Sequence, residues 1–397
     1  MTITSLILSL AAANDIRQDI AIIPREYYEI IRERNESSAV PLVPPLENEV
    51  PDIYYIVLDA YANSETLLEF YGYDNSEFVD LLEAQGFIVP KNIYANYPRT
   101  ALSVASTTNM EYWDALVPEM DKVRSWWPTK HFLEKSIVQS SLEEIGYTTI
   151  SFANDWGLTN NKNSSIYLQP YPILLTNIED YLIRATPLRL LQKPLQNIMP
   201  IKTHDVHRHF IRYNLETLKE IPEMQGPKFV FSHIVFPHDP IVFDKDGNPI
   251  QTKNKFSFSS PEVTKDERQK LYIGQVEYIN SQMKDVIKAI LEKSSTPPII
   301  IIQADHGLGL SMTFNPNENQ CFQERLSIFG AYYLPGKNLD TLFQDYSSVN
   351  LFRIIFNEYF STELALLENR FFFTQESNLF AGMQEITPKV KIFCDIE

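Results

Sequence analysis

The run Ile53-Tyr54-Tyr55-Ile56-Val57-Leu58-Asp59 decides the fold of this chain. Its first six residues are aliphatic, β-branched or aromatic without a break, which is typical of a strand buried on both faces of a parallel sheet. A carboxylate follows directly. Because ligands of parallel α/β sheets bind beyond the carboxyl ends of the strands, Asp59 is a candidate site residue from its position alone.

Two further apolar runs extend this pattern. Residues Phe229–Ile234 and Ile299–Gln303 predict strands, and Thr264–Lys293 predicts a helix between them because apolar residues recur there at steps of three and four. Thr264 and Glu267 have the spacing of a capping box at its start. Strand, helix and strand of this length predict a right-handed crossover and parallel pairing. We therefore expect an α/β fold with a central, largely parallel sheet sandwiched by helices.

The sequence divides into two regions. Residues 1–50 contain a short apolar start, a charged stretch expected to be partly helical, and a proline-rich linker. The apolar start is too short to span a bilayer. It is interpreted as a weak signal peptide, as the stump of a lost membrane anchor, or as a frayed terminus. Residues 51–397 form the expected catalytic domain, with an insertion at about 156–210 and a late apolar strand over Leu326–Leu334.

The composition restricts the class of protein. The 397 residues are 44% hydrophobic and include 24 Phe and 21 Tyr, which is enough for a sizeable core. A net charge of −17 argues against a nucleic-acid partner and gives no general attraction to anionic membranes. An anionic substrate would therefore have to be captured by local positive charge. The two cysteines, Cys321 and Cys394, could form one disulfide or none.

Polar residues follow each of the three predicted strands. Asp59 ends the first, Asp305-His306 follows the third after one alanine, and His238 lies just past the second. Singly, each has an ordinary explanation, since such a carboxylate can cap a helix and a lone histidine is usually structural. Together they would meet at one edge of the sheet, which predicts a metal site there.

A candidate nucleophile lies in Asn96–Ser106. Pro98 ends an extended stretch, and the small residues after it predict a helix beginning near Thr100. A hydroxyl at a helix N-terminus is close to free backbone N–H groups and to the positive end of the dipole, which also bind phosphate or sulfate oxygens. A plain helix-capping role for Thr100 is the alternative. Arg99 could hold an anionic ester or be a surface charge.

These residues, in this order, resemble the sulfatase-like branch of the alkaline-phosphatase superfamily, which includes lipoteichoic-acid synthases, phosphoethanolamine transferases and arylsulfatases. The similarity runs from about Pro51 to the mid-300s. The strand ending in Asp59 resembles the family's opening strand with its metal carboxylate, and Ala304–Gly307 resembles its Asp-His-Gly. Arg325–Gly336 is similar to the strand ending in Pro-Gly, and Pro237–Pro240 to the segment that supplies a substrate-side histidine.

The resemblance implies roles for individual residues. One divalent cation would be held by Asp59, Thr100, Asp305 and His306. Thr100 would be the nucleophile and His238 would protonate or orient the leaving group. Substrate-side positions would be Arg99, His233 and Arg325, although structural pairing is as good an explanation for Arg325. Two-zinc alkaline phosphatases use a further histidine after Asp-His-Gly, and none follows His306 here, so one metal is expected. Mn²⁺ or Zn²⁺ is favoured, with Mg²⁺ or Ca²⁺ possible.

The nucleophile stretch departs from the sulfatase pattern. Classical sulfatases need Cys or Ser, then Pro two places on and Arg two places after that, to make formylglycine. Here the run is Thr100-Ala101-Leu102-Ser103-Val104, which resembles the phosphotransferase branch instead. The implied substrate is an anionic ester, perhaps linked to envelope lipids or glycans. The implied location is the extracytoplasmic face of the membrane or the periplasm, with any membrane contact through a lost or missing N-terminal anchor.

Two other functions remain open: a sulfate-ester hydrolase without formylglycine, and a catalytically silent member that acts as a binding module. The cluster His204, His207 and His209 also suggests metal binding. Because Arg208 lies among these histidines, a solvated or lid-facing helix is the favoured interpretation.

Overall fold

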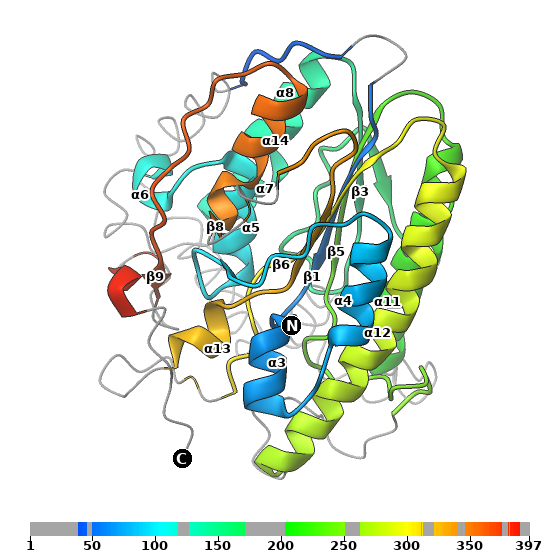
Figure 1. The fold of residues 1–397 in the computed structure, drawn as a ribbon, viewed down its shortest axis with the longest axis vertical. Helices are drawn as coiled ribbons and strands as arrows, with labels where there is room; N and C mark the ends of the chain where they lie inside the picture. The colour runs from blue at the N-terminus through cyan, green and yellow to red at the C-terminus, as the bar shows by residue number, and fades with distance from the viewer. Residues whose placement is uncertain are drawn as a thin grey trace, which may run out of the picture.

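The computed structural model shows a central sheet with helices on both sides (Figure 1). The structure describes residues 39–45, 50–117, 127–170, 203–250, 263–310, 312, 321–339, 343, 346–374, 380 and 382–389. The predicted apolar start and charged stretch of residues 1–38, most of the predicted insertion (171–202) and Cys394 lie outside these ranges.

The sheet has six strands in the order β4-β3-β5-β1-β6-β7. Five of them are parallel, and β7 pairs with β6 in the antiparallel direction. The strands are β1 (Ile53–Leu58), β3 (Thr148–Phe152), β4 (Ile166–Leu168), β5 (Lys228–Ile234), β6 (Ile299–Ala304) and β7 (Gly330–Tyr333). The predicted fold class, with a largely parallel central sheet, is confirmed.

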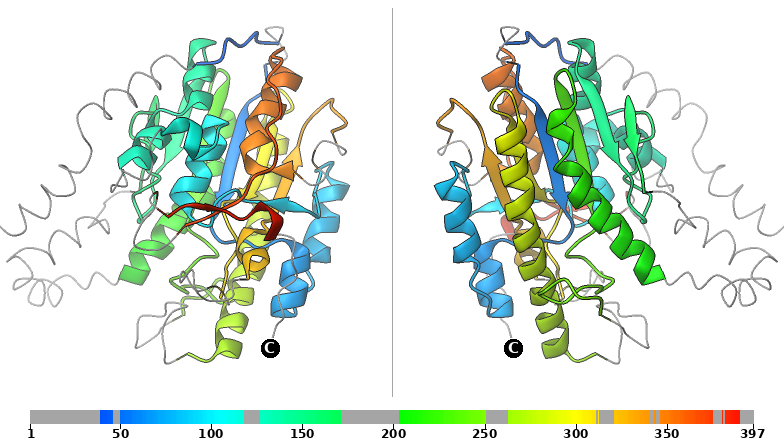
Figure 2. Two further views of the ribbon diagram at one scale, coloured as in Figure 1. Left: turned by 90° about the vertical axis from the view of Figure 1, so that its left-hand side faces the viewer. Right: turned by 90° about the vertical axis from the view of Figure 1, so that its right-hand side faces the viewer.

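Helices cover both faces of this sheet (Figures 1 and 2). One face carries α3 (Ser64–Tyr71), α4 (Ser76–Ala84), α11 (Thr203–Leu218) and α12 (Lys265–Lys293). The other carries α5 (Thr100–Asn109), α7 (Trp127–Glu134), α8 (Ile137–Glu144) and α14 (Leu351–Tyr359). Shorter elements are α6 (Trp113–Leu116), α13 (Phe322–Leu326), the strand pairs β2 (Ile93–Tyr94) with β8 (Tyr346–Ser347) and β9 (Phe372–Phe373) with β10 (Gln384–Glu385), and the 3-10 helices Ile221–Glu223, Ser348–Asn350 and Thr387–Lys389.

The strand β1 lies at the centre, between β5 and β6. All six of its residues are buried, as its unbroken apolar sequence predicts. The crossover helix α12 also matches the prediction, because Thr264 caps it and forms a complete capping box with Glu267. The β5–α12–β6 unit therefore passes over β1, which fills the place between its two strands.

One predicted element is wrong in its extent. The expected strand over Leu326–Leu334 exists only from Gly330 to Tyr333, and Leu326 ends the short helix α13. Ser327 and Ile328 form bridges with Tyr94 and Ala62 instead of joining β6. These tertiary contacts override the strand propensity of the apolar run.

The predicted insertion contributes to the layers at both of its ends. Strand β4 pairs with β3 in the main sheet, and α11 packs beside α12. Within the described ranges, no helix is both long and apolar enough to cross a membrane.

Candidate active site

Asp59 starts the site at the carboxyl end of β1. Its N–H donates to the carbonyl of Ile234 at 3.1 Å, and its own carbonyl accepts from the N–H of His238 at 3.1 Å. The next residue, Ala60, has φ of +62°, which is uncommon for a residue with a side chain. The N–H of Ala60 donates to Oδ1 of Asp305 at 3.1 Å. The turn after β1 thus ties the two predicted metal carboxylates together.

Asp305 and His306 follow β6, and the loop after them depends on Gly307. A Cβ at Gly307 would collide with the carbonyl oxygen of Glu324. The N–H of Gly307 donates to the carbonyl of Arg325 at 2.6 Å. Only glycine therefore lets the Asp-His-Gly loop pack against this backbone.

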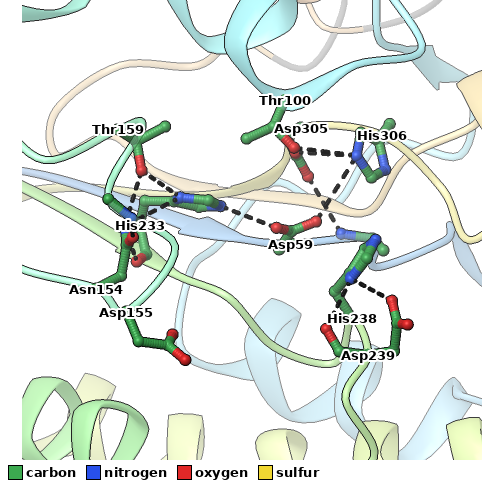
Figure 3. Close-up of polar contacts among 12 residues, drawn as sticks. Asp59, Thr100, Asn154, Asp155, Thr159, His233, His238, Asp239, Asp305 and His306 are labelled. Atoms are coloured by element: carbon green, nitrogen blue, oxygen red, sulfur yellow. Dashed lines mark hydrogen bonds and ion pairs between the residues drawn. The ribbon is translucent and has the colours of Figure 1, made fainter. Parts of the chain in front are cut away.

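Four ionisable side chains meet here, drawn in Figure 3. Ligand-type atoms of Asp59, His233 and Asp305 all lie within 4.8 Å of one another, and the three residues are buried. The Nε2 of His233 is 3.3 Å from Oδ2 of Asp59. The Nε2 of His306 is 3.3 Å from Oδ2 of Asp305 and 3.7 Å from Oδ1 of Asp59. Two carboxylates and two imidazoles thus face a common centre.

Contacts of the other ring nitrogens indicate which atoms carry lone pairs. Nδ1 of His306 lies 3.0 Å from the carbonyl of Gly307, and Nδ1 of His233 lies 2.7 Å from Oγ1 of Thr159. The carbonyl of Gly307 can only accept, so we assign the ring proton of His306 to Nδ1, which leaves its Nε2 with the lone pair. The hydroxyl of Thr159 can donate or accept, so its contact with His233 fits either tautomer of that ring.

Three polar atoms of the site lack a hydrogen-bond partner among the residues that the structure describes. Within the described part of the chain, Oδ1 of Asp59, Oδ2 of Asp305 and Nε2 of His233 are buried without a hydrogen-bond partner. Buried acceptors that face one another without donors are uncommon, and a divalent cation would satisfy all of them. The residues present therefore fit a metal ion.

The pKa values show the same excess of negative charge. Burial and the charge of Asp59 raise the pKa of Asp305 to about 6. Burial works against ionisation of Asp59 too, but His238, His233 and His306 together hold the pKa of this carboxyl below its usual range. Burial and the neighbouring Arg325 hold the pKa of His306 well below its usual value, so this ring is neutral, as a metal ligand must be.

Thr100 occupies the first position of α5, directly after Arg99, as the sequence predicts. It is 7% exposed, and its hydroxyl lies 3.1 Å from Nε2 of His306. Every residue of α5 is buried, so the N-terminus of this helix is fixed against the site. The helix dipole and the first N–H groups favour an anion at this point.

Arg325 joins the segments before and after the site. Its Nε donates to the carbonyl of Pro98 at 2.9 Å, and Nη1 donates to the carbonyls of Gly307 at 3.0 Å and Leu308 at 2.9 Å. Its Nη2 lies 3.0 Å from Nε2 of His306. Burial lowers the pKa of Arg325 to about 10, so it remains charged at neutral pH. It therefore braces the loops and also brings positive charge to the site.

A cavity of about 220 Å³ opens beside these residues. It is lined by Asp59, Arg99, Thr100, Ala101, Asp155, Trp156, His207, Val235, His238, Asp239, Pro240, His306 and Arg325. Six of the eight predicted site residues thus line one cavity, whereas Asp305 and His233 lie outside this lining. The Nδ1 of His238 is 2.7 Å from Oδ1 of Asp239. Burial disfavours the charged ring, but Asp59 and Asp239 raise the pKa of His238 to about 10.

Sequence analysis did not identify several residues of this region. Thr159, which contacts His233, lies in the loop after β3, and no sequence pattern singles it out. Asp155, in the same loop, contacts His207 and lines the cavity. His207 belongs to the histidine cluster of α11, but the structure places it against a carboxylate, while His209 is exposed and His204 is half-buried.

Comparisons with known proteins agree with this architecture. A sequence model of the Sulfatase family matches residues 51–355. No curated protein matches the chain. The C-terminal periplasmic domain of EcEptC from Escherichia coli aligns with 12% identity and a TM-score of 0.57, covering 88% of this chain and 97% of that one.

Two other solved structures share the fold. The soluble domain of lipooligosaccharide phosphoethanolamine transferase A from Neisseria meningitidis has 12% identity and a TM-score of 0.51, covering 86% of this chain and 98% of that one. The phosphonate monoester hydrolase of Agrobacterium radiobacter has 12% identity and a TM-score of 0.51, covering 84% and 88%. Because the family match covers most of the sequence, the chain belongs to the Sulfatase family, the sulfatase-like hydrolases and transferases of the alkaline-phosphatase superfamily.

Proposed function

We propose that this chain is a metal-dependent hydrolase or transferase of phosphate esters that uses Thr100 as its nucleophile. The observation that carries the proposal is the position of the Thr100 hydroxyl. It lies at the N-terminus of α5 and 3.1 Å from His306, beside two carboxylates that each have an oxygen without a hydrogen-bond partner among the described residues. A plain helix cap would not need this buried cluster beside it.

The proposed cation site consists of Asp59, Thr100, Asp305 and His306, holding one divalent ion. His233 extends this set, because its Nε2 lies 3.3 Å from Asp59 and has no hydrogen-bond donor among the described residues. Mixed oxygen and imidazole ligands suit Mn²⁺ or Zn²⁺, with Mg²⁺ or Ca²⁺ as weaker candidates. EcEptC has also been solved in complex with Zn, which supports zinc as the first ion to test.

The side chains divide the proposed reaction among them. When bound, the cation would lower the pKa of the nucleophilic hydroxyl and offset charge on the transferred group. Thr100 Oγ1, deprotonated because of this lowered pKa, attacks phosphorus and displaces the leaving oxygen. His238 lines the same cavity and donates a proton to that oxygen. Arg99 and Arg325 hold the non-bridging oxygens against the net negative charge of the chain.

The proposed substrate is an anionic ester of an envelope lipid or glycan, met outside the cytoplasm. Two neighbours in the fold are a periplasmic domain and the soluble domain of a lipooligosaccharide phosphoethanolamine transferase, which supports this location. Cys321 is disulfide-bonded. A disulfide suits an oxidising compartment.

The first test measures metal content and ester turnover together. We expect about one divalent ion per chain in the wild type and its loss in Asp305→Ala. Turnover of an aryl phosphate should fall on the order of 10³-fold or more in Thr100→Ala. Thr108→Ala is the matched control, because Thr108 lies on the same helix but bonds the carbonyl of Val104 at 2.9 Å. Unchanged turnover in Thr100→Ala would refute the proposal.

The same assay separates the other functions. Faster turnover of an aryl sulfate than of the phosphate would favour a sulfate-ester hydrolase without formylglycine, which the family match supports. A folded wild type that takes up no metal and turns over neither ester would favour the binding module.

A further inference from the structure

A buried histidine–carboxylate pair in the cavity wall has no role in the function proposed above. Asp155 lies in the loop after β3, and His207 lies on α11. The Nδ1 of His207 is 2.9 Å from both carboxylate oxygens of Asp155. Only 1% of the His207 side chain and 8% of the Asp155 side chain are exposed.

The partner of Nδ1 determines the state of the other ring nitrogen. An ionised carboxylate only accepts hydrogen bonds, so Nδ1 of His207 carries a proton and Nε2 holds the lone pair. This Nε2 is buried and has no hydrogen-bond partner in the part of the chain that the structure describes. A buried polar atom without a partner is destabilising, so a partner from outside the described residues is expected.

The location of the ring identifies that partner. His207 and Asp155 line the same 220 Å³ cavity as Thr100 and the two arginines. A pair that served only to fasten α11 to the sheet would have no reason to face this cavity. An imidazole held through Nδ1 by a carboxylate, with Nε2 free, is the arrangement of a general base.

The cavity offers few other proton acceptors. The carboxylate of Asp239 contacts His238, and that of Asp155 contacts His207. His306 faces Thr100 and Arg325 through its Nε2. Among the described lining residues of this cavity, His207 is the imidazole whose Nε2 is buried without a hydrogen-bond partner. His238 also contacts a carboxylate through Nδ1, but the proposed function already uses it as the acid of the first half of the reaction.

We propose that His207 is the general base of the second half of the reaction, acting on the hydroxyl of water or an alcohol, and that Asp155 positions it. This inference rests on the proposed function, because it needs a phosphorylated Thr100. The acceptor oxygen bonds to phosphorus while the bond from phosphorus to Thr100 Oγ1 breaks. The acceptor proton passes to Nε2 of His207, and the electron pair of the broken bond returns to Oγ1.

The test separates the two halves of the reaction in the metal-loaded enzyme. Because His207 takes no part in the first half of the reaction, His207→Gln should release the first equivalent of nitrophenol from 4-nitrophenyl phosphate at the wild-type rate. Steady-state turnover should then fall about 10²–10⁴-fold, with KM not raised. Phosphorylated Thr100 should accumulate and be found by peptide mass spectrometry after acid quenching. Added glycerol, as an alcohol acceptor, should not restore the rate.

Asp155→Asn is the second variant and leaves the imidazole of His207 in place while it changes the tautomer. The amide N–H can donate to Nδ1 of His207, which moves the ring proton to Nε2 and removes the base without removing the ring. We expect the same accumulation of phosphorylated Thr100. Imidazole added to His207→Ala should restore part of the turnover, a result that a structural pair would not give.

Several outcomes would overturn the inference. Turnover within about threefold of the wild type in folded Asp155→Asn and His207→Gln would mean that the pair is structural, as would equal slowing of both phases without phosphorylated Thr100. Accumulation in His238→Gln instead would assign the base to His238. Should His207→Gln fail to fold, Asp155→Asn decides alone. The proposed function fails separately, if Thr100→Ala retains turnover or quenched wild-type enzyme never carries phosphate on Thr100.

Discussion

Replacing Asp305 with asparagine should stabilise the metal-free protein while it removes metal binding. The substitution keeps an oxygen that can accept the 3.1 Å hydrogen bond from the N–H of Ala60. It removes one of two negative charges from a buried site in which Asp59 stays ionised. The packing is therefore nearly constant, and the charge is what changes.

The size of the effect follows from the pKa of Asp305. Burial and the charge of Asp59 raise it from 3.8 to about 6, a change that corresponds to about 3 kcal/mol. A folded-state pKa above the unfolded value means that the folded protein binds the proton more tightly. The stabilisation of the folded wild type by this bound proton is complete below pH 3.8 and is lost as the pH rises through about 6.

The assay is urea unfolding in the presence of a chelator between pH 4 and 8. The free energies of unfolding of wild type and Asp305→Asn should be similar near pH 4. At pH 7.5 and above, the variant should be more stable by about 3 kcal/mol or somewhat less. Asp246→Asn is the control, because Asp246 is exposed in the loop after Phe243 and should show neither effect.

Metal should reverse the order of the two proteins. A free cation concentration of 100 times the dissociation constant would stabilise the wild type by about 2.7 kcal/mol and leave the variant almost unchanged. If the variant is less stable than the wild type in chelator at pH 8, while retaining a native circular dichroism spectrum, the argument from excess charge is wrong.

Three further substitutions test the supports of the site. Gly307→Ala should lower the unfolding free energy by about 1–3 kcal/mol and weaken metal binding, because its Cβ collides with the carbonyl of Glu324; calorimetry checks both. Thr159→Val should lower metal affinity about 10–100-fold with the fold intact, because His233 loses its 2.7 Å contact; metal titration measures this. Arg325→Lys should reduce kcat more than it raises KM, since an ammonium cannot make the four contacts of the guanidinium; steady-state kinetics decides.

Much of the fold could be predicted because the sequences of its central elements are each typical of only one kind of secondary structure. The run before Asp59 is apolar at every position, and α12 has both a clear period and a complete cap. The late strand was placed wrongly at its start because the extended segment around Ile328 pairs with Ala62, and no local pattern reports such a partner.

The site shows the same division. Residues that directly follow strands, such as Asp59 and Asp305, could be brought together in advance because parallel strands end at one edge. The positions of Thr159 and Asp155 depend on how the loops after β3 fold back, which periodicity does not encode. The histidine cluster made His207 visible in the sequence. Its partner Asp155 comes from a distant segment of the chain, with Oδ1 2.9 Å from Nδ1 of His207, and no sequence pattern indicates this contact.

The central place of β1 has a consequence for synthesis of the protein. Ile53 pairs with Phe229 on one side and Ile299 on the other. The ribosome therefore synthesises β1 long before the two strands that pair with it. At about 5–20 residues per second, translation leaves it unpaired for about 10–50 s. During that time an apolar, β-prone segment is open to association with other nascent chains. We therefore expect the yield of folded protein to depend on chaperones that cover this segment, and to improve when translation of the region before Ile299 is fast.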